Sequence, residues 1–345
     1  MSTVASGFSR TLLASAAVAA ACLTLSAQSP GRGVQDPAWS PDGKRLATSF
    51  VDRIWISGAD GRKGRPLTSD ALAVERDPAW SRDGRTIAFA ADSGTGFDIY
   101  TAPSARGAAA AVTEMEGDER WPSWTPDGRI VFSHRAHPLA RWRLMTVSAE
   151  GGTPAPLFGD ADAPQQHEER EGRLSPDGTR IAYVSDREAT DGDVDLWVAE
   201  LPADERPRAR HTRVTDARGR EGFPSWSPDG SRLAFYAVRE GAGAVWVAAI
   251  DPAEESSVRV RPASPDVLLS RRGGVPAWSP DGRRILCLQQ GGTNRMAAFT
   301  VDGPREVTTV AEAAGSGFPQ SWSPAGNLMA YTMNGRGTRS DIWVR

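Results

Sequence analysis

The chain of 345 residues is poor in cysteine, with only Cys22 and Cys287. Cys22 lies in a short apolar segment near the N-terminus, so a chain without that segment would hold Cys287 alone. A single cysteine forms no internal disulfide, and Cys287 sits in an apolar run where a thiol packs as a small apolar group. We therefore expect the fold to be held by packing alone.

Motifs of several enzyme classes are also missing. The sequence has no Gly-x-Ser-x-Gly elbow of serine hydrolases, no Walker loop and no His-Glu-x-x-His helix of zinc proteases. The net charge is −3 and no run of basic residues stands out. Nucleic acid is therefore not an expected partner, and we expect no catalytic residue and no cofactor.

A repeat covers almost the whole chain. Its anchors, all tryptophan except Leu174, fall at positions 39, 80, 124, 174, 226, 278 and 322, with gaps of 41, 44, 50, 52, 52 and 44 residues. Short strands and tight turns at a period in the forties are typical of a β-propeller. The sequence predicts an all-β fold, a seven-bladed β-propeller of mostly four-stranded antiparallel blades, and leaves open whether the last blade is complete.

One repeat, residues 224–236, shows why the pattern folds this way. Pro228, Asp229 and Gly230 suit a tight hairpin turn, in which Gly230 takes the positive φ. The apolar strand after the turn suits burial between neighbouring blades. A large ring at one position per repeat fills the wedge between adjacent sheets. We therefore expect the anchor tryptophans to pack rather than to bind a ligand.

This repeat resembles the TolB-type propeller repeat, a WD-repeat-like family common in bacterial envelope proteins. The resemblance covers about residues 34–345 and rests on the Trp-Ser-Pro-Asp-Gly turn followed by an Asp-Ile-Tyr or Asp-Ile-Trp strand. Arg82, Leu174 and Ala325 depart from the pattern, but their repeats keep the glycine and the apolar strand. The resemblance implies residence in the periplasm and a role in an envelope complex.

The N-terminal segment, residues 1–27, has the features of a secretory signal peptide. Arg10 precedes an apolar run, and small residues before Gln28 predict cleavage after Ala27. The run is too short for a membrane span, so we expect no transmembrane segment in the mature chain. In the alternative, Cys22 is a lipid anchor. We expect residues 28–345 to form one propeller domain, periplasmic or secreted, and monomeric.

Candidate binding residues precede the inner strands. Glutamate stands five residues before the anchor in four consecutive repeats, and arginine follows it in three of them. These residues are Glu75, Arg76, Glu119, Arg120, Glu169, Arg170 and Glu221. In a propeller this segment reaches the mouth of the central channel, so we expect an arc of alternating charge there. Such mouths bind small molecules and peptides, although the same charges can merely pair across blades at little gain.

Three functions stay open at this stage. The leading hypothesis is an exported, non-enzymatic propeller that binds an envelope protein or peptide through its channel mouth and loops. The second is a metal-dependent polysaccharide lyase or hydrolase that uses His134, His137 and His167, because imidazole binds divalent transition metals. The third is the propeller fragment of a larger peptidase-like protein.

Overall fold

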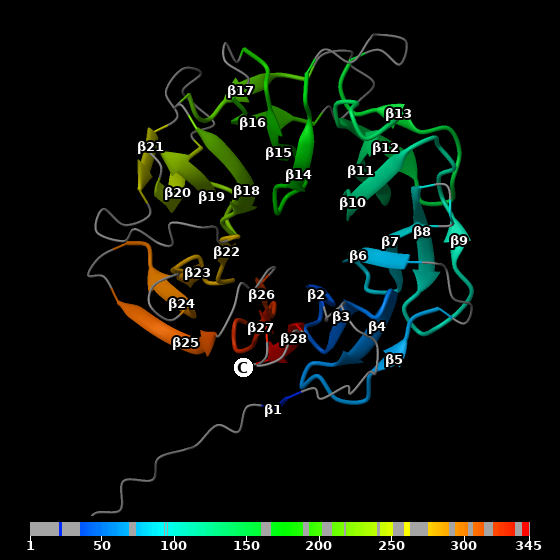
Figure 1. Ribbon diagram of the computed structural model, residues 1–345, viewed down its shortest axis with the longest axis horizontal. Coiled ribbons are helices and arrows are strands. Elements are labelled where there is room, and N and C mark those ends of the chain that lie inside the picture. The colour runs from blue at the N-terminus through cyan, green and yellow to red at the C-terminus, as the bar shows by residue number, and fades with distance from the viewer. Residues whose placement is uncertain are drawn as a thin grey trace, which may run out of the picture.

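A computed structural model describes residues 21–22, 35–68, 74–92, 94, 96–159, 167–188, 193–201, 209–216, 219–239, 242–250, 259–262, 275–289, 294–302, 306–313, 320–334 and 340–344. Its strands form antiparallel sheets arranged in a ring (Figure 1). Apart from residues 21 and 22, the segment expected to be a signal peptide lies outside the described residues. In the described part of the chain no helix is long and apolar enough to cross a membrane.

Six blades are each built from four consecutive strands. The first holds β2 (Gln35–Trp39), β3 (Arg45–Phe50), β4 (Arg53–Gly58) and β5 (Arg65–Pro66), and the second β6 (Val74–Trp80), β7 (Thr86–Asp92), β8 (Phe97–Pro103) and β9 (Ala110–Ala111). The third holds β10 (Asp118–Trp124), β11 (Arg129–Arg135), β12 (Arg143–Ser148) and β13 (Ala155–Pro156). The fourth holds β14 (Arg170–Leu174), β15 (Arg180–Ser185), β16 (Asp195–Glu200) and β17 (His211–Arg213). The fifth holds β18 (Arg220–Trp226), β19 (Arg232–Arg239), β20 (Ala242–Ala249) and β21 (Arg259–Pro262), and the sixth β22 (Ala277–Trp278), β23 (Arg284–Gln289), β24 (Asn294–Thr300) and β25 (Val307–Ala313).

The last sheet combines both ends of the chain. It joins β26 (Gln320–Trp322), β27 (Met329–Asn334) and β28 (Ser340–Val344) with the two-residue strand β1 (Ala21–Cys22). The expected all-β propeller with mostly four-stranded antiparallel blades is thus confirmed, but six blades rather than seven consist of consecutive strands. Cleavage after Ala27 would remove β1 and leave this sheet with three strands.

The ring closes through its inner strands. The indole Nε1 of Trp39 in β2 donates to the carbonyl oxygen of Ser321 in β26 at 3.4 Å, and the Ser321 hydroxyl donates to the Pro37 carbonyl at 3.1 Å. These two hydrogen bonds connect the first blade to the last sheet, which are almost the whole chain apart in sequence.

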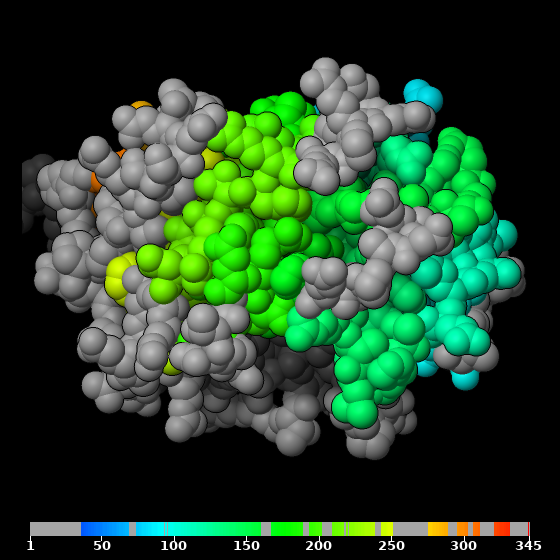
Figure 2. Space-filling model, turned by 90° about the horizontal axis from the view of Figure 1, so that it is seen from above, coloured from blue at the N-terminus to red at the C-terminus, as the bar shows by residue number. Residues whose placement is uncertain are grey.

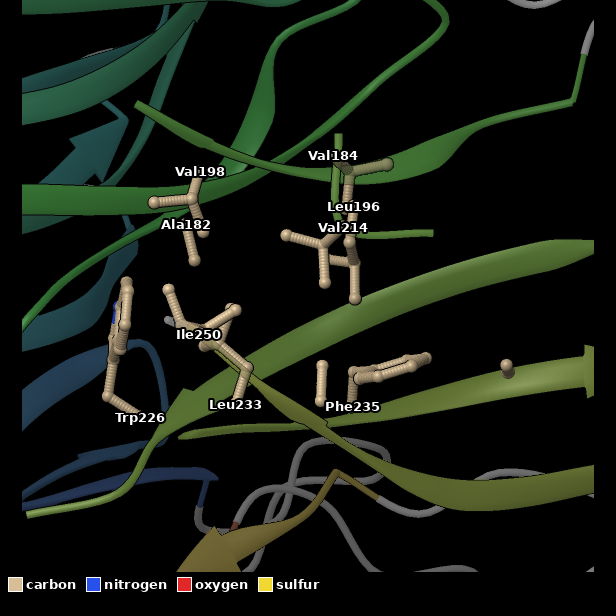
Figure 3. Close-up of a cluster of buried hydrophobic side chains, with 11 residues drawn as sticks. Ala182, Val184, Leu196, Val198, Val214, Trp226, Leu233, Phe235 and Ile250 are labelled. Carbon is tan, nitrogen blue, oxygen red and sulfur yellow. The ribbon is translucent and has the colours of Figure 1, made fainter. Parts of the chain in front are cut away.

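The core lies between neighbouring blades. One cluster joins Val184 and Leu196 of the fourth blade to Trp226, Leu233 and Phe235 of the fifth (Figure 3). Trp226 also donates its Nε1 hydrogen to the Arg173 carbonyl of the preceding blade at 2.9 Å. The expected packing role of the anchor tryptophans is confirmed, because this indole fills the junction and satisfies its polar atom there. From the side, the blades coloured green to yellow-green lie next to one another along the rim (Figure 2).

The hairpin turn repeats with the same hydrogen bonds. In the fifth blade the Ser227 hydroxyl donates to Asp229 at 2.5 Å and accepts the Arg232 backbone N–H at 2.9 Å, while Gly230 has φ of 68°. The first of these bonds is the main reason why the pKa of Asp229 is lowered to about 2. The turn residues are therefore occupied by local structure, as expected from the sequence.

Candidate functional site

The glutamates of the predicted arc are buried between blades. Glu75, Glu119, Glu169 and Glu221 are between 0 and 6% exposed. The Glu75 carboxylate accepts the backbone N–H of Ile54 at 2.7 Å and the hydroxyl of Thr68 at 2.8 Å, both in the preceding blade. It therefore ties the start of β6 to the start of β4 and to the end of the first blade.

The same clasp recurs in the next two junctions. Glu119 accepts the Ile99 backbone N–H at 3.2 Å and a hydrogen bond from the Thr113 hydroxyl. Glu169 accepts the Leu144 backbone N–H and pairs with Arg187 at 3.3 Å. In each case the buried carboxylate accepts a hydrogen bond from a backbone N–H group, which would otherwise need another acceptor. The carboxylate is therefore a structural element of the ring. We call these contacts the Glu clasps.

Glu119 titrates unusually because burial disfavours its charged form. Burial raises its pKa from 4.5 to about 7, against the lowering effect of the Thr113 hydrogen bond. Its Oε1 atom is buried and has no hydrogen-bond partner in the described part of the structure. The native state thus binds a proton near neutral pH that the unfolded chain releases near pH 4.5.

Because Glu119 binds a proton in the native state, the stability of wild type should depend on pH differently from that of a variant without this carboxyl group. A group with a raised native pKa contributes stability that is complete below its unfolded pKa and is lost as the pH rises through its native pKa. Relative to wild type, Glu119→Gln should therefore gain on the order of 2 kcal/mol of unfolding free energy between pH 5 and pH 8. Urea denaturation at both pH values measures the difference, with the exposed Glu116→Gln as control. A constant difference would refute the assignment.

The arginines of the predicted arc lie at the same ends of the inner strands. Arg120 pairs with Asp77 of the preceding blade through two hydrogen bonds of 2.6 and 3.2 Å, and its guanidinium lies 4.7 Å from the centre of the Phe97 ring. Arg170 pairs with Glu168 at 3.3 Å and with Glu171. Arg76 is half-buried. These side chains are more accessible than the glutamates next to them.

A second series of residues, three positions before the anchor, was not predicted from the sequence. Non-glycine residues there adopt positive φ of 54 to 58° in five successive blades. They are Asp36, Asp77, Trp121, Glu171 and Phe223. Each lies where the inner strand has a bulge in its pairing with the next strand. We call them the axial bulge residues, because they stand on the strands nearest the centre of the ring (Figure 1).

The axial bulge residues are linked from blade to blade. The Asp77 carboxylate accepts the Trp121 backbone N–H at 3.3 Å, and the Glu171 carboxylate accepts the Phe223 backbone N–H at 2.7 Å. Asp36 likewise accepts the Asp77 backbone N–H. Burial, and secondarily the Asp77 carboxylate, raise the pKa of Asp36 to about 6. Acidic members thus fix the backbone of their neighbours, while Trp121 and Phe223 have no carboxylate to do so.

Aromatic side chains gather beside this series. The Trp121 ring lies 5.1 Å from the Trp142 ring, and the Arg135 guanidinium lies 4.6 Å from the centre of Trp142. Both indoles are half-buried, and Phe223 is 39% exposed. Among the large apolar residues described, only Phe223, Leu139 and Val307 are exposed. Aromatic residues are enriched at protein interfaces.

The histidines do not form a metal cluster in the described chain. His134 bonds to the Glu116 carbonyl at 2.9 Å, His167 lies 3.7 Å from Asp186, and His137 is exposed. No group of three or more metal-ligating side chains occurs among the described residues. Among the residues that the structure places, His134, His137 and His167 therefore do not converge on a common metal site.

Comparisons with known proteins agree with the fold. The chain is 31% identical over 115 residues to the uncharacterized peptidase YuxL of Bacillus subtilis, which covers 33% of this chain and only 16% of that protein. A protein described as TolB from Agrobacterium tumefaciens superposes with a TM-score of 0.53 at 17% identity, covering 92% of this chain and 91% of the other. An oligogalacturonate lyase in complex with manganese gives 0.65 at 14% identity, covering 91% and 89%. At these identities the two structures show the fold alone.

A sequence-family model matches part of the chain. The model of the TolB beta propeller domain matches residues 18–156, which include the first two blades and the third blade up to Pro156. The repeat and the arrangement of the sheets agree with this match. Residues 18–156 are thus similar to the TolB beta propeller domain, and the described chain has the fold of a β-propeller.

Proposed function

We propose that the protein is an exported, non-enzymatic binding module that takes an envelope protein or peptide on the axial end of its ring. The observation that carries the proposal is the row of axial bulge residues. A left-handed backbone at a non-glycine residue costs about 1–3 kcal/mol and persists where the surrounding structure holds it, and such residues cluster at active sites and ligand clamps. Here it recurs in five successive blades, and Phe223 is exposed at one of these positions.

The glutamates and the arginines of the predicted arc have different roles in this proposal. The Glu clasps hold the inner strands in place, while Arg76, Arg120 and Arg170 lie beside the axial bulge residues and present charge. A ring held by blade-to-blade contacts presents such a surface in advance, which lowers the entropic cost of binding. We further propose that the last sheet completes the ring as a seventh blade.

We also propose that the chain is exported, in keeping with the predicted signal peptide. It would then reside in the periplasm or be secreted after cleavage at Ala27, or be anchored through a lipid on Cys22. The mass of the mature protein isolated from the cell envelope distinguishes these cases.

The test is affinity capture from an envelope extract. The baits are the wild-type chain, the double variant Trp121→Ala/Phe223→Ala, and Val307→Ala, which removes an exposed apolar side chain on the outer strand β25. We expect wild type and Val307→Ala to retain the same partner and the double variant to lose it, because exposed aromatic anchors dominate interface energies. The single variant Phe223→Ala is the control for misfolding of the double variant, since the Phe223 ring is not part of the core. Equal recovery by all baits would refute the proposal.

A further inference from the structure

The outer strands of the blades differ in length. In the first five blades the outer strand has only two to four residues. In the sixth blade the outer strand is β25, which has seven residues and forms the outer edge of its sheet (Figure 1). Short edge strands protect a sheet from pairing with another chain. The edge of β25 therefore lacks a protection that its counterparts in the other blades have.

The backbone of β25 directs hydrogen-bonding groups away from the blade. The carbonyl oxygen of Glu306, the residue before the strand, accepts the backbone N–H of Thr300 in β24 at 3.0 Å. Along an antiparallel pair, residues that bond to the partner strand alternate with residues whose N–H and C=O groups face away from it. Val307 and Thr309 therefore direct these groups outward. In the described part of the chain, β24 is the only strand paired with β25.

The first part of β25 is exposed but held in place. The Val307 side chain is 40% exposed, and Thr308 and Thr309 are also exposed. Val310, at a bulge in the pairing with β24, is only 3% exposed and packs in the same core cluster as Trp322 of the last sheet. Because this anchor keeps the strand extended, pairing with a further strand requires little additional ordering of β25.

The charges along this edge favour a basic partner. The acidic residues are Glu312 within β25 and Glu306 just before it, and β25 contains no basic residue. Glu312 is opposite Arg295 of β24, whereas the exposed Glu306 is opposite Thr300. Opposite charges on neighbouring strands stabilise a sheet, and like charges destabilise it. An added strand is therefore favoured when it carries a basic residue across from Glu306.

We propose that the outer edge of β25 binds an extended segment of a partner protein, which pairs with it as a fifth strand of the sixth blade. The main-chain groups of Val307 and Thr309 supply the hydrogen bonds. The exposed side chains select a segment with β-branched residues and with a basic residue opposite Glu306. This site lies on the rim of the ring, so it goes beyond the proposed function and does not depend on it.

The experiment selects from a displayed library of short random peptides with the full chain as target. Val307→Pro removes the outward N–H group, and the matched control Val307→Ala keeps it. Proline is tolerated at the first position of an edge strand, so both variants should unfold at the same denaturant concentration. We expect wild type and Val307→Ala to bind β-branched peptides with one basic residue. Val307→Pro should bind them about tenfold more weakly, as for one lost hydrogen bond, and Glu306→Gln should lose the basic preference.

Methylation of the peptide nitrogens, one at a time, tests the same proposal without a variant of the protein. Binding should be lost at alternate positions only, because alternate N–H groups of an added strand face β25. The absence of this alternation, equal affinity for Val307→Pro and Val307→Ala, or the absence of any enriched peptide overturns the proposal. A wild-type dimer in sedimentation that Val307→Pro dissociates also overturns it, because the edge then binds a second copy of the chain. The proposed function is tested separately, through Trp121 and Phe223.

Discussion

Gly117→Ala is expected to lower the free energy of unfolding by about 4 kcal/mol or more, enough to leave much of the chain unfolded. Gly117 has φ of 103°, and a Cβ atom there would lie 2.0 Å from the carbonyl oxygen of Arg135 and 2.8 Å from the Cα of Ala136. Both contacts are with backbone, so a side-chain rotation cannot relieve them. The start of β10 or the end of β11 must move, and β10 carries Glu119 and Trp121.

The matched control is Gly94→Ala. Gly94 has a similar φ of 109°, but a Cβ atom there meets nothing within 4 Å. It should lose only about 1 kcal/mol, the cost of the backbone conformation. Chemical denaturation followed by circular dichroism measures both variants. If the two lose equal stability, the close approach of Gly117 to Arg135 does not exist in solution.

Glu75→Ala is expected to lower the free energy of unfolding by about 3 kcal/mol, because it leaves the buried Ile54 N–H and Thr68 hydroxyl without their acceptor. Glu75 is 0% exposed, and both of its oxygens accept a hydrogen bond. Glu75→Gln keeps the shape and one acceptor oxygen, so it should lose about 1 kcal/mol. The exposed Glu116→Ala should leave stability unchanged within about 0.5 kcal/mol.

The result decides what the Glu clasps do. If they are structural, Glu75→Ala loses stability, and the fraction that stays folded binds the partner as wild type does. A variant of wild-type stability that fails to bind would instead place Glu75 on the binding surface, and the clasp would be wrong. Thermal unfolding and partner binding measured on the same preparation provide both readings.

The propeller could be predicted from the sequence because its signals are local and repeated. Trp226, the turn that begins at Ser227 and the strand after it each have one physical explanation, and the structure gives each that role. The hydrogen bond from the tryptophan Nε1 to the neighbouring blade also follows, because a buried indole N–H needs an acceptor. The pairing of Ala21 and Cys22 with β28 could not be predicted, because two residues carry no strand pattern.

The positions of the arc residues could not be predicted because a bulge intervenes. In a regular strand, residues an odd number apart face opposite sides, so Glu75 would point away from the junction that Trp80 fills. The bulge between Arg76 and Ala79 adds one residue to the count. Glu75 therefore shares the side of Trp80 and contacts the preceding blade. The residue three positions before the anchor varies among the repeats, for example from Asp77 to Trp121. The sequence therefore gives no sign of this bulge.

The most direct test of binding at the axial end of the ring compares the affinity of the captured envelope partner for Phe223→Ala and for wild type. Phe223 is exposed and lies outside the buried core, so the variant should unfold at the same denaturant concentration. We expect a loss of affinity of at least about tenfold, as for an aromatic anchor at the centre of an interface. Unchanged affinity in a folded variant would contradict binding at the axial end of the ring.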